Sequence, residues 1–307
     1  MMRNGRGGRG LACLALAATV ILAAMAAGGC KSGGPGTVVD DAGRSVTLER
    51  VPEKIVSMAP SNTEILFAIG VGDKVVGVTS YCTHPPEALA VEKVGDAWNP
   101  DYEKIVSLEP DLVLAVGTAD SDIVRALENY GLTVFVLQAS TLAQVADDIE
   151  LVGKVTGAEA RAAEVAGELR ARMRAVGLEL SDLGDAERPS VFWVLDSLLW
   201  TVGPGSFIDD LIDLAGGYNI GRSLGLAYGQ FSMESLLEAD PDVIIIPVLD
   251  AATPEALAAI DGWDTLTAVV NGRVYQIDPD AVSQPGPRVV DALEQVAALL
   301  HPDLFGD

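Results

Sequence analysis

The sequence predicts an α/β protein built from two similar three-layer α/β lobes with mostly parallel sheets, joined by one long backbone helix. Three observations support this fold class. Strand and helix patterns alternate along the chain, one central helical segment is long and polar, and the chain before it resembles the chain after it. Alternating strands and helices give parallel sheets covered on both faces. With 307 residues, 49% of them hydrophobic, the chain is long enough for two cores.

The N-terminal lobe is expected over residues 38–156. Its strands are short runs rich in Ile, Val and Leu, and each is followed by a stretch with helical periodicity or helix-start residues. We expect strands at 55–58, 74–78, 112–116 and 133–137, and helices at 61–69, 120–130 and 141–155.

The long bridging helix is expected over residues 157–180. Thr156 and Glu159 have the spacing of a capping box, in which a hydroxyl and a carboxylate accept from free N–H groups at a helix start. The apolar residues share one narrow face: Val165, Leu169, Met173 and Val176. About 20 helical residues extend ~30 Å, roughly the diameter of a small domain. We therefore expect this helix to join two bodies; an ordinary surface helix is the alternative.

The C-terminal lobe is expected over residues 181–307. We expect strands at 190–195, 243–247 and 273–277, and helices at 206–215, 254–260 and 287–300. Trp193 lies on the first of these strands and is expected in the core.

A repeat relates the two lobes. In each, a short helix that opens on Glu leads to a Pro-Asp turn and an apolar strand. Glu103 stands seven residues before Pro110, and Glu234 stands seven before Pro241. The joint match of helix, turn and strand indicates two related lobes. Since ligands of such folds bind where loops leave the strand ends, we expect a ligand cleft between the lobes.

Residues 1–29 have the layout of a secretory signal peptide. Three arginines precede an apolar run at 11–27, which is short for a membrane span of about 20 residues. Cys30, directly after two glycines, resembles the lipidation site of a bacterial lipoprotein, with Ala27 where that signal usually has Leu. Residues 30–37 would then be the lipidated Cys and its tether. Ordinary secretion with an unmodified Cys30 is the alternative.

The charge and cysteine content narrow the possible partners. Removal of the signal takes away three arginines and no acidic residue, which moves the formal net charge from −24 to −27. Because nucleic-acid phosphates require Lys and Arg, no nucleic-acid partner is expected. Cys13 leaves with the signal and Cys30 would carry lipid, so Cys82 remains alone and no internal disulfide can form. Cys82 is expected to be a structural thiol.

Four segments of the chain resemble a known family. Segments 57–66, 76–86 and 214–219, together with the repeat segment at Glu103, resemble the periplasmic substrate-binding proteins of ABC importers for cobalamin, haem and ferric siderophores. The similarity begins at about Thr37, and within the family the chain most resembles the cobalamin-binding members. It implies two α/β lobes on one long helix, capture of a ligand in the cleft, and docking of both lobes on a permease that works with an ATPase.

Together with the signal region, the resemblance leads us to expect a monomeric protein that is lipid-anchored outside the cytoplasm, on the periplasmic or outer face. Cobalamin or a related corrinoid is the expected ligand, with haem and ferric siderophores as alternatives. A lipoprotein that senses its ligand without transporting it is an alternative of another class.

The resemblance assigns a docking role to the two repeat glutamates. In the family an acidic residue on each lobe enters an arginine pocket of the permease, and these positions fall on Glu103 and Glu234. Paired carboxylates set orientation and speed encounter more than they add affinity. The alternative is that each glutamate only interacts with the positive end of its helix.

The resemblance also places ligand-binding positions on four aromatic residues: Tyr81, Trp98, Trp200 and Tyr228. Trp98 and Tyr228 lie in loops rich in Gly, Pro or Asn, a few residues before the docking glutamates. An aromatic ring on such a loop stays exposed, at a cost, unless a ligand or another surface covers it. Packing against the core is the alternative. Tyr228 stands where cobalamin binders can carry Trp. Arg288 is a further candidate that would meet a siderophore anion or a haem propionate, or else is surface charge at a helix start.

Direct metal capture and catalysis are not expected, and no resident cofactor is expected. A metal site needs three or four His or carboxylate ligands, and the chain has two histidines. His301 is expected to be exposed, and His84 precedes two prolines, although an axial contact with a haem iron or cobalt is an alternative for it. The segment 70–75 lacks the third glycine of a dinucleotide fingerprint, and 203–207 lacks the Gly-x-Ser-x-Gly pattern.

Overall fold

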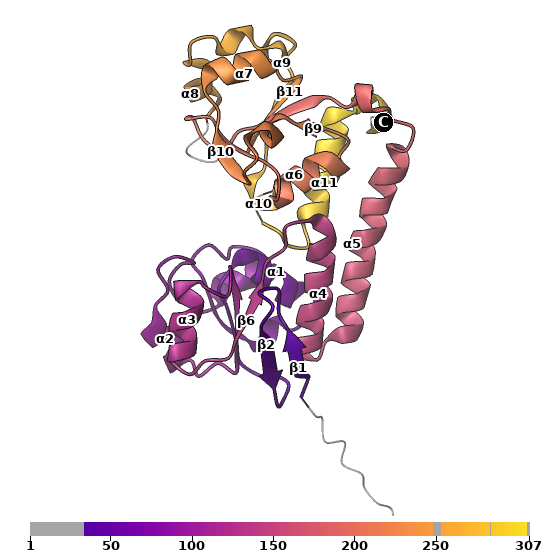
Figure 1. Ribbon diagram of the computed structural model, residues 1–307. Coiled ribbons are helices and arrows are strands. Elements are labelled where there is room, and N and C mark those ends of the chain that lie inside the picture. The colour runs from indigo at the N-terminus through magenta and orange to yellow at the C-terminus, as the bar shows by residue number, and fades with distance from the viewer. Residues whose placement is uncertain (1–33, 248–252, 283, 306–307) are drawn as a thin grey trace, which may run out of the picture. The chain divides into compact units, whose positions relative to one another are not determined.

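The computed structural model describes residues 34–247, 253–282 and 284–305, all within one compact unit of the chain. The predicted signal peptide and Cys30 lie outside the described residues. An N-terminal α/β lobe ends with α4 (Leu142–Thr156), and a C-terminal α/β lobe follows α5 (Glu159–Glu179) (Figure 1). The predicted fold class is confirmed.

Each lobe contains a four-stranded parallel sheet, and the two sheets have the same topology. Counted in chain order, the strands of each sheet are arranged second, first, third, fourth. The N-terminal sheet consists of β4 (Val75–Val78), β3 (Ile55–Ser57), β5 (Leu112–Val116) and β6 (Val134–Leu137). The C-terminal sheet consists of β9 (Tyr218–Asn219), β7 (Ser190–Trp193), β11 (Val243–Pro247) and β12 (Val274–Ile277). The third strands, β5 and β11, are almost wholly buried, as expected where helices cover both faces.

The remaining helices belong to one lobe or the other. Those of the N-terminal lobe are α1 (Pro60–Ala68), α2 (Tyr102–Ser107) and α3 (Asp122–Asn129). Those of the C-terminal lobe are α6 (Phe207–Leu214), α7 (Met233–Ala239), α8 (Pro254–Ala258), α9 (Thr267–Val270), α10 (Pro279–Val282), α11 (Val289–Leu300) and α12 (Pro302–Phe305).

Two antiparallel pairs of strands were not predicted from the sequence. They are β1 (Gly36–Val39) with β2 (Ser45–Leu48), and β8 (Trp200–Val202) with β10 (Tyr228–Gln230). Each strand has at most four residues and is partly exposed, so its apolar pattern is too short to stand out. β1 begins at the end of the stretch predicted as the tether.

The internal repeat has the same local structure in both lobes. α2 leads through Pro110 to β5, and α7 leads through Pro241 to β11. The residue before each proline is left-handed, with φ of 51° at Glu109 and 34° at Asp240. This conformation is costly for residues with a side chain, so its occurrence at both turns indicates that the turns are equivalent.

α5 joins the lobes and packs on both. It lies beside α4 of the N-terminal lobe and contacts α11 of the C-terminal lobe (Figure 1). Arg170 pairs with two carboxylates of α4, and Arg172, about half a turn on, pairs with two carboxylates of α11. Neighbouring residues of one helix therefore fasten it to different lobes.

The predicted capping box at the start of this helix is wrong. Thr156 is the last residue of α4, and its hydroxyl donates to the carbonyl oxygen of Val152 at 2.7 Å. Gly157, with φ of 74°, ends α4, and α5 begins at Glu159 after Ala158, whose side chain makes no capping bond. Two helices meet at this point, so the hydroxyl bonds within the first helix instead of capping the second.

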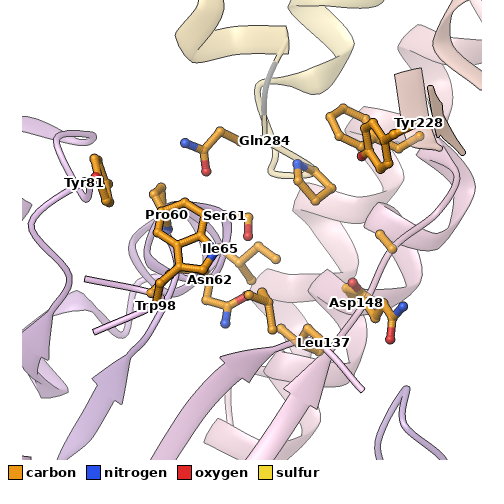
Figure 2. Close-up of a pocket in the computed structure, with 18 residues that line it drawn as sticks. Pro60, Ser61, Asn62, Ile65, Tyr81, Trp98, Leu137, Asp148, Tyr228 and Gln284 are labelled. Atoms are coloured by element: carbon orange, nitrogen blue, oxygen red, sulfur yellow. The ribbon is translucent and has the colours of Figure 1, made fainter. Parts of the chain in front are cut away.

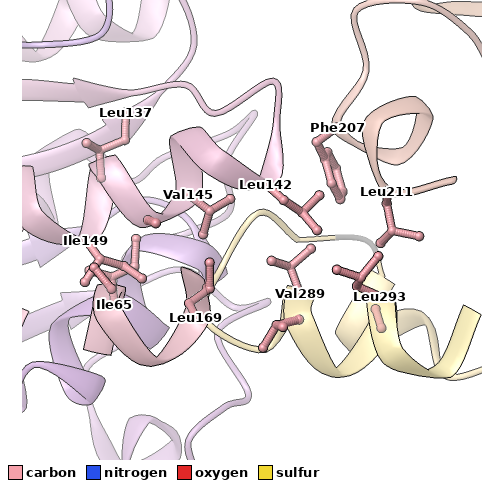
Figure 3. Packing of buried hydrophobic residues seen from close by; sticks show 14 of the residues in the cluster. Ile65, Leu137, Leu142, Val145, Ile149, Leu169, Phe207, Leu211, Val289 and Leu293 are labelled. Carbon is pink, nitrogen blue, oxygen red and sulfur yellow. The ribbon is translucent and has the colours of Figure 1, made fainter. Parts of the chain in front are cut away.

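One apolar core is continuous from the N-terminal lobe to the C-terminal lobe. Figure 3 shows Leu142 of α4 beside Phe207 of α6, with Val289 and Leu293 of α11 below them. Because the lobes bury side chains against each other here, and interiors are close-packed, this junction limits how far the lobes can move apart.

We expect Gly153→Ala to destabilise the protein by about 1–3 kcal/mol, because a Cβ at Gly153 of α4 would lie 2.2 Å from the Cβ of Ala162 of α5. Gly167→Ala is the matched control. Gly167 lies exposed within α5 with open space at its Cβ, so the same change should stabilise by about 0.5–1 kcal/mol. Urea unfolding of the two variants measures both effects. Equal shifts for the two substitutions would show that the α4–α5 contact is not tight.

Candidate functional site

A cavity of about 590 Å³ lies between the lobes and is lined by residues of both (Figure 2). The N-terminal lobe contributes residues that follow the carboxyl ends of three neighbouring strands: Pro60 after β3, Gly117 after β5 and Gln138 after β6. The C-terminal lobe contributes Phe207 at the start of α6 and Tyr228 of β10. Ligands of parallel α/β folds bind at this edge of a sheet, and the volume is that of a small-molecule site.

Three of the four aromatic residues predicted to bind ligand line this cavity. Tyr81 and Trp98 belong to the N-terminal lobe, and their rings meet edge to face with centroids 5.8 Å apart. Tyr228 reaches the cavity from the C-terminal lobe (Figure 2). Trp98 is 73% exposed, Tyr81 54% and Tyr228 52%. These rings are not packed against the core, so the alternative stated for the two loop aromatics does not describe them.

The loop that carries Trp98 is held in place by the side chain of Asp96. The Asp96 carboxylate accepts from the N–H groups of Asn99 and Trp98 at 2.7 and 2.8 Å, and these bonds lower the pKa of Asp96. Gly95 has φ of 91°, and a Cβ there would lie 2.5 Å from the carbonyl oxygen of Asn99. The indole is therefore presented to the cavity by a tight turn.

Trp200 and Arg288 are not brought to this cavity. Trp200 is the first residue of β8, opposite Gln230 of β10, on the same face of the two-stranded sheet as Tyr228 but outside the cavity lining. Arg288 lies at the start of α11 and donates two hydrogen bonds to the buried carboxylate of Glu64 of α1, at 2.6 and 3.1 Å. This ion pair links the two lobes beside a smaller cavity of about 400 Å³.

Removing one partner of this ion pair should be costly, and unequally so. Arg288→Ala would leave Glu64, whose side chain is 4% exposed, as a buried charge without its arginine, at a cost of about 3 kcal/mol. Glu64→Ala should cost less, because Arg288 is 26% exposed and reaches water. Thermal unfolding of each variant, and of Arg288→Ala combined with Glu64→Leu, checks this. The combination should recover part of the loss, and no recovery would contradict the assignment.

Asn62 and Asp148 are polar lining residues that the sequence reasoning missed. Asn62 of α1 is 1% exposed, and its Nδ2 has no hydrogen-bond partner within the described part of the chain. Asp148 of α4 is 4% exposed. Burial, and then the neighbouring Asp41 carboxylate, raises the pKa of Asp148 to about 9, so the carboxyl is neutral at pH 7.

A sequence signal for Asp148 did exist. It stands three residues after Val145 and four before Val152, both buried, so it lies on the apolar face of α4. An acidic residue on such a face requires a neutral state or a partner. Asn62 lies within the 57–66 segment that carried the family resemblance, but nothing in the sequence marked its amide as unpaired.

We expect Asp148→Asn to stabilise the protein increasingly as pH rises. Between the ordinary carboxyl pKa of 3.8 and about 9, the folded state binds one more proton than the unfolded state, so wild-type stability falls with rising pH. That contribution is intact below the unfolded pKa and lost as pH passes the folded pKa. The difference between variant and wild type should grow by up to about 1.4 kcal/mol per pH unit. Urea unfolding at pH 5.5, 7 and 8.5 measures it, and a constant difference would contradict the buried neutral acid.

The two repeat glutamates occupy equivalent positions on the lobes. Glu103 and Glu234 are each the second residue of their helix, α2 and α7, and both are exposed. Their helices are capped by Asp101 and Ser232, which accept from backbone N–H groups. Across the described ranges neither glutamate forms an ion pair. Both glutamates interact favourably with the positive end of their helix dipole, and both carboxylates remain exposed to solvent.

The structure also places Cys82, Trp193 and the two histidines, which the sequence analysis singled out. Cys82 is buried with Thr63 and Thr79 hydroxyls within 3.2 Å and 3.1 Å of its sulfur, and Trp193 is fully buried as predicted. His84 lines the smaller cavity. The prediction that His301 is exposed is wrong. It is 8% exposed, with Nε2 3.2 Å from the Gly216 carbonyl oxygen, because the chain continues into α12 and the ring packs under the Gly216 turn.

The described residues offer neither a cluster of metal ligands nor a membrane-spanning helix. Residues 34–247, 253–282 and 284–305 hold no group of three His, Cys, Asp or Glu side chains placed to bind a metal ion. No helix in these ranges has the length and apolar character to cross a membrane.

Two lobes of equal topology, with exposed aromatic rings facing a cavity between them, define a two-lobed ligand-binding protein. The chain belongs to the periplasmic binding protein family, whose model matches residues 55–281. The uncharacterized ABC transporter substrate-binding lipoprotein YvrC of Bacillus subtilis is 35% identical over 277 residues, covering 88% of this chain and 87% of that protein. A cobalamin-binding protein of Halobacterium salinarum is 33% identical over 276 residues, covering 87% and 74%.

A solved structure shows the same fold. The periplasmic vitamin B12 binding protein BtuF of Vibrio cholerae superposes with a TM-score of 0.72 at 30% identity, covering 84% of this chain and 99% of that one. Membership of the family makes this chain an extracytoplasmic substrate-binding component of an ABC importer, and its relatives are named as binding proteins, not as enzymes.

Proposed function

We propose that this protein captures cobalamin or a related corrinoid in the cavity between its lobes and delivers it to the permease of an ABC importer. The observation that carries the proposal is the set of exposed rings, Tyr81 and Trp98 on one lobe and Tyr228 on the other, that face a common cavity. Each ring can bury roughly 150–250 Å² when covered. A large ligand with flat apolar faces would cover all three at once. Two relatives named for cobalamin or vitamin B12 support the choice of ligand.

The proposed delivery step uses one carboxylate on each lobe. Glu103 and Glu234 would enter arginine pockets on the two permease subunits, which would orient the protein with its cavity over the transport path. In the same proposal Cys30 carries a lipid that keeps the protein at the membrane, in line with the lipoprotein name of one relative. Cys30→Ser protein that still sediments with membranes would count against the anchor.

Titration of the purified mature chain with cyanocobalamin, haemin and a ferric siderophore, each followed by its visible spectrum, tests the ligand. We expect saturable binding of cyanocobalamin to one site. Binding of haemin or the siderophore in its place would overturn the corrinoid assignment within the same family. Uptake by vesicles that contain the permease and ATPase then separates transport from sensing, because a sensor would bind its ligand without raising uptake.

A further inference from the structure

The N-terminal wall of the cavity carries a hydrogen-bond donor that lies almost out of reach of bulk water. This donor is the Nδ2 amide of Asn62, which is 1% exposed and unpaired within the described part of the chain. Asp148, which is 4% exposed, lines the same wall, and its carboxyl interacts with the side chain of Asp41. Figure 2 shows both side chains on the N-terminal lobe, with Leu137 between them in this view. Buried donors of this kind are normally satisfied, so an unpaired one at a cavity wall indicates a ligand atom that accepts.

The polar groups around the cavity are neutral amides, hydroxyls and an indole, with one carboxyl. Gln138, directly after β6, lines the N-terminal side of the cavity together with Asp148. Gln284 faces the cavity from the C-terminal lobe. No Lys, Arg or His is among the described lining residues. Two further carboxylates act on Asp148: Asp41, and more weakly Asp147, which is paired with Arg170 at 2.6 Å. The Asp41 carboxylate is fixed there by accepting from the Gln138 N–H at 2.7 Å.

From this arrangement we infer that the cavity selects a ligand with neutral carboxamide groups at its edge over the same ligand with carboxylates. The inference rests on the proposed corrinoid function and narrows it. A carboxamide oxygen would accept from the Asn62 amide and bring no charge into the site. A carboxylate would accept equally well, but it would face the Asp41 charge without a cation in the described lining. Corrinoids with amidated side chains meet this requirement, whereas tetrapyrroles with free propionates do not.

The test compares corrinoids that share one ring and differ only at the edge. The probes are dicyanocobinamide, whose side chains are amides, dicyanocobyrinic acid, whose side chains are carboxylates, and the heptamethyl ester of the latter. At pH 7 we expect cobinamide to bind at least 10-fold more tightly than cobyrinic acid. The ester keeps carbonyl acceptors without charge, so it should bind closer to cobinamide than to the acid. Equal affinity for cobinamide and cobyrinic acid would overturn the inference and leave the proposed function standing.

Two variants assign the preference to named side chains. Asn62→Leu keeps the branched shape at Cγ but has no donor, and it should weaken cobinamide binding about 10-fold. Gln284→Lys adds a cation at the cavity and should raise the affinity for cobyrinic acid. The preference for cobinamide over cobyrinic acid should therefore fall several-fold. If Asn62→Leu fails to fold, as judged by its urea midpoint, Gln284→Lys still decides, because an unchanged preference there would contradict an electrostatic origin. Failure of cyanocobalamin and all three probes to bind the wild type would overturn the proposed function and the inference together.

Discussion

Combined replacement of Trp98 and Tyr228 by alanine is expected to weaken cobalamin binding by about 100-fold or more. The two rings lie on different lobes and line one cavity, and both are more than half exposed. A bound corrinoid would cover both. Loss of a buried aromatic contact of about 1.5 kcal/mol at each position corresponds to about 10-fold per ring. Equilibrium titration with cyanocobalamin measures the affinities of the single and combined variants.

Tyr218→Ala provides the control for this prediction. Tyr218 is a C-terminal-lobe tyrosine that is 50% exposed, much like Tyr228, but it does not line the cavity. Its loss should change the affinity by less than about twofold. Trp200→Ala decides between the family-based assignment of Trp200 and the cavity geometry, which leaves it out. An unchanged affinity for Trp98→Ala would contradict the role given to the aromatic rim.

Charge reversal at both repeat glutamates, Glu103→Arg with Glu234→Arg, is expected to lower corrinoid uptake at least about 30-fold while capture stays within twofold. Truncating one partner of a close interfacial charge pair costs about 2–5 kcal/mol, and reversal adds repulsion from the permease arginines. Both residues are exposed on short helices and neither lines the cavity, so binding of the ligand should not change. Uptake by cells or permease vesicles, paired with titration of the same protein, separates the two effects.

Glu238→Arg is the matched control for the single reversal Glu234→Arg, because Glu238 is exposed on the same helix and the two single variants change the net charge equally. Uptake by this variant should stay near the wild-type rate. An equal loss with Glu238→Arg would mean that the overall charge of the surface, and not the repeat position, governs encounter with the permease.

The parts of the fold that were predictable are those that depend on local patterns. β5 and β11 are continuous apolar runs because both faces of their sheets are covered, and their predicted bounds match. The repeat around Glu103 and Glu234 was visible because helix, turn and strand recur together. The strands β8 and β10 were missed because three residues each, with glycine in one of them, carry too little pattern.

The parts of the site that were not predictable depend on neighbours distant in sequence. The Glu64–Arg288 pair joins residues 224 positions apart, so the sequence could not show that Arg288 is engaged away from the main cavity. Asp148 is recognisable as an acid on an apolar helix face. Its neutral state, however, follows from burial and from Asp41, which the β1–β2 hairpin brings to it. The capping box predicted at Thr156 and Glu159 shows a different limit: the spacing is present, but Thr156 ends α4 and its hydroxyl bonds within that helix.

Hydrogen–deuterium exchange of the mature chain, with and without saturating cyanocobalamin, tests the central claim most directly. If the ligand lies between the lobes, protection should appear together in 59–65 and 95–100 of the N-terminal lobe and in 226–230 and 284–288 of the C-terminal lobe. The α2 and α7 helices that carry the docking glutamates should be unaffected. Protection confined to one lobe, or its absence from all four segments, would contradict capture in the cavity between them.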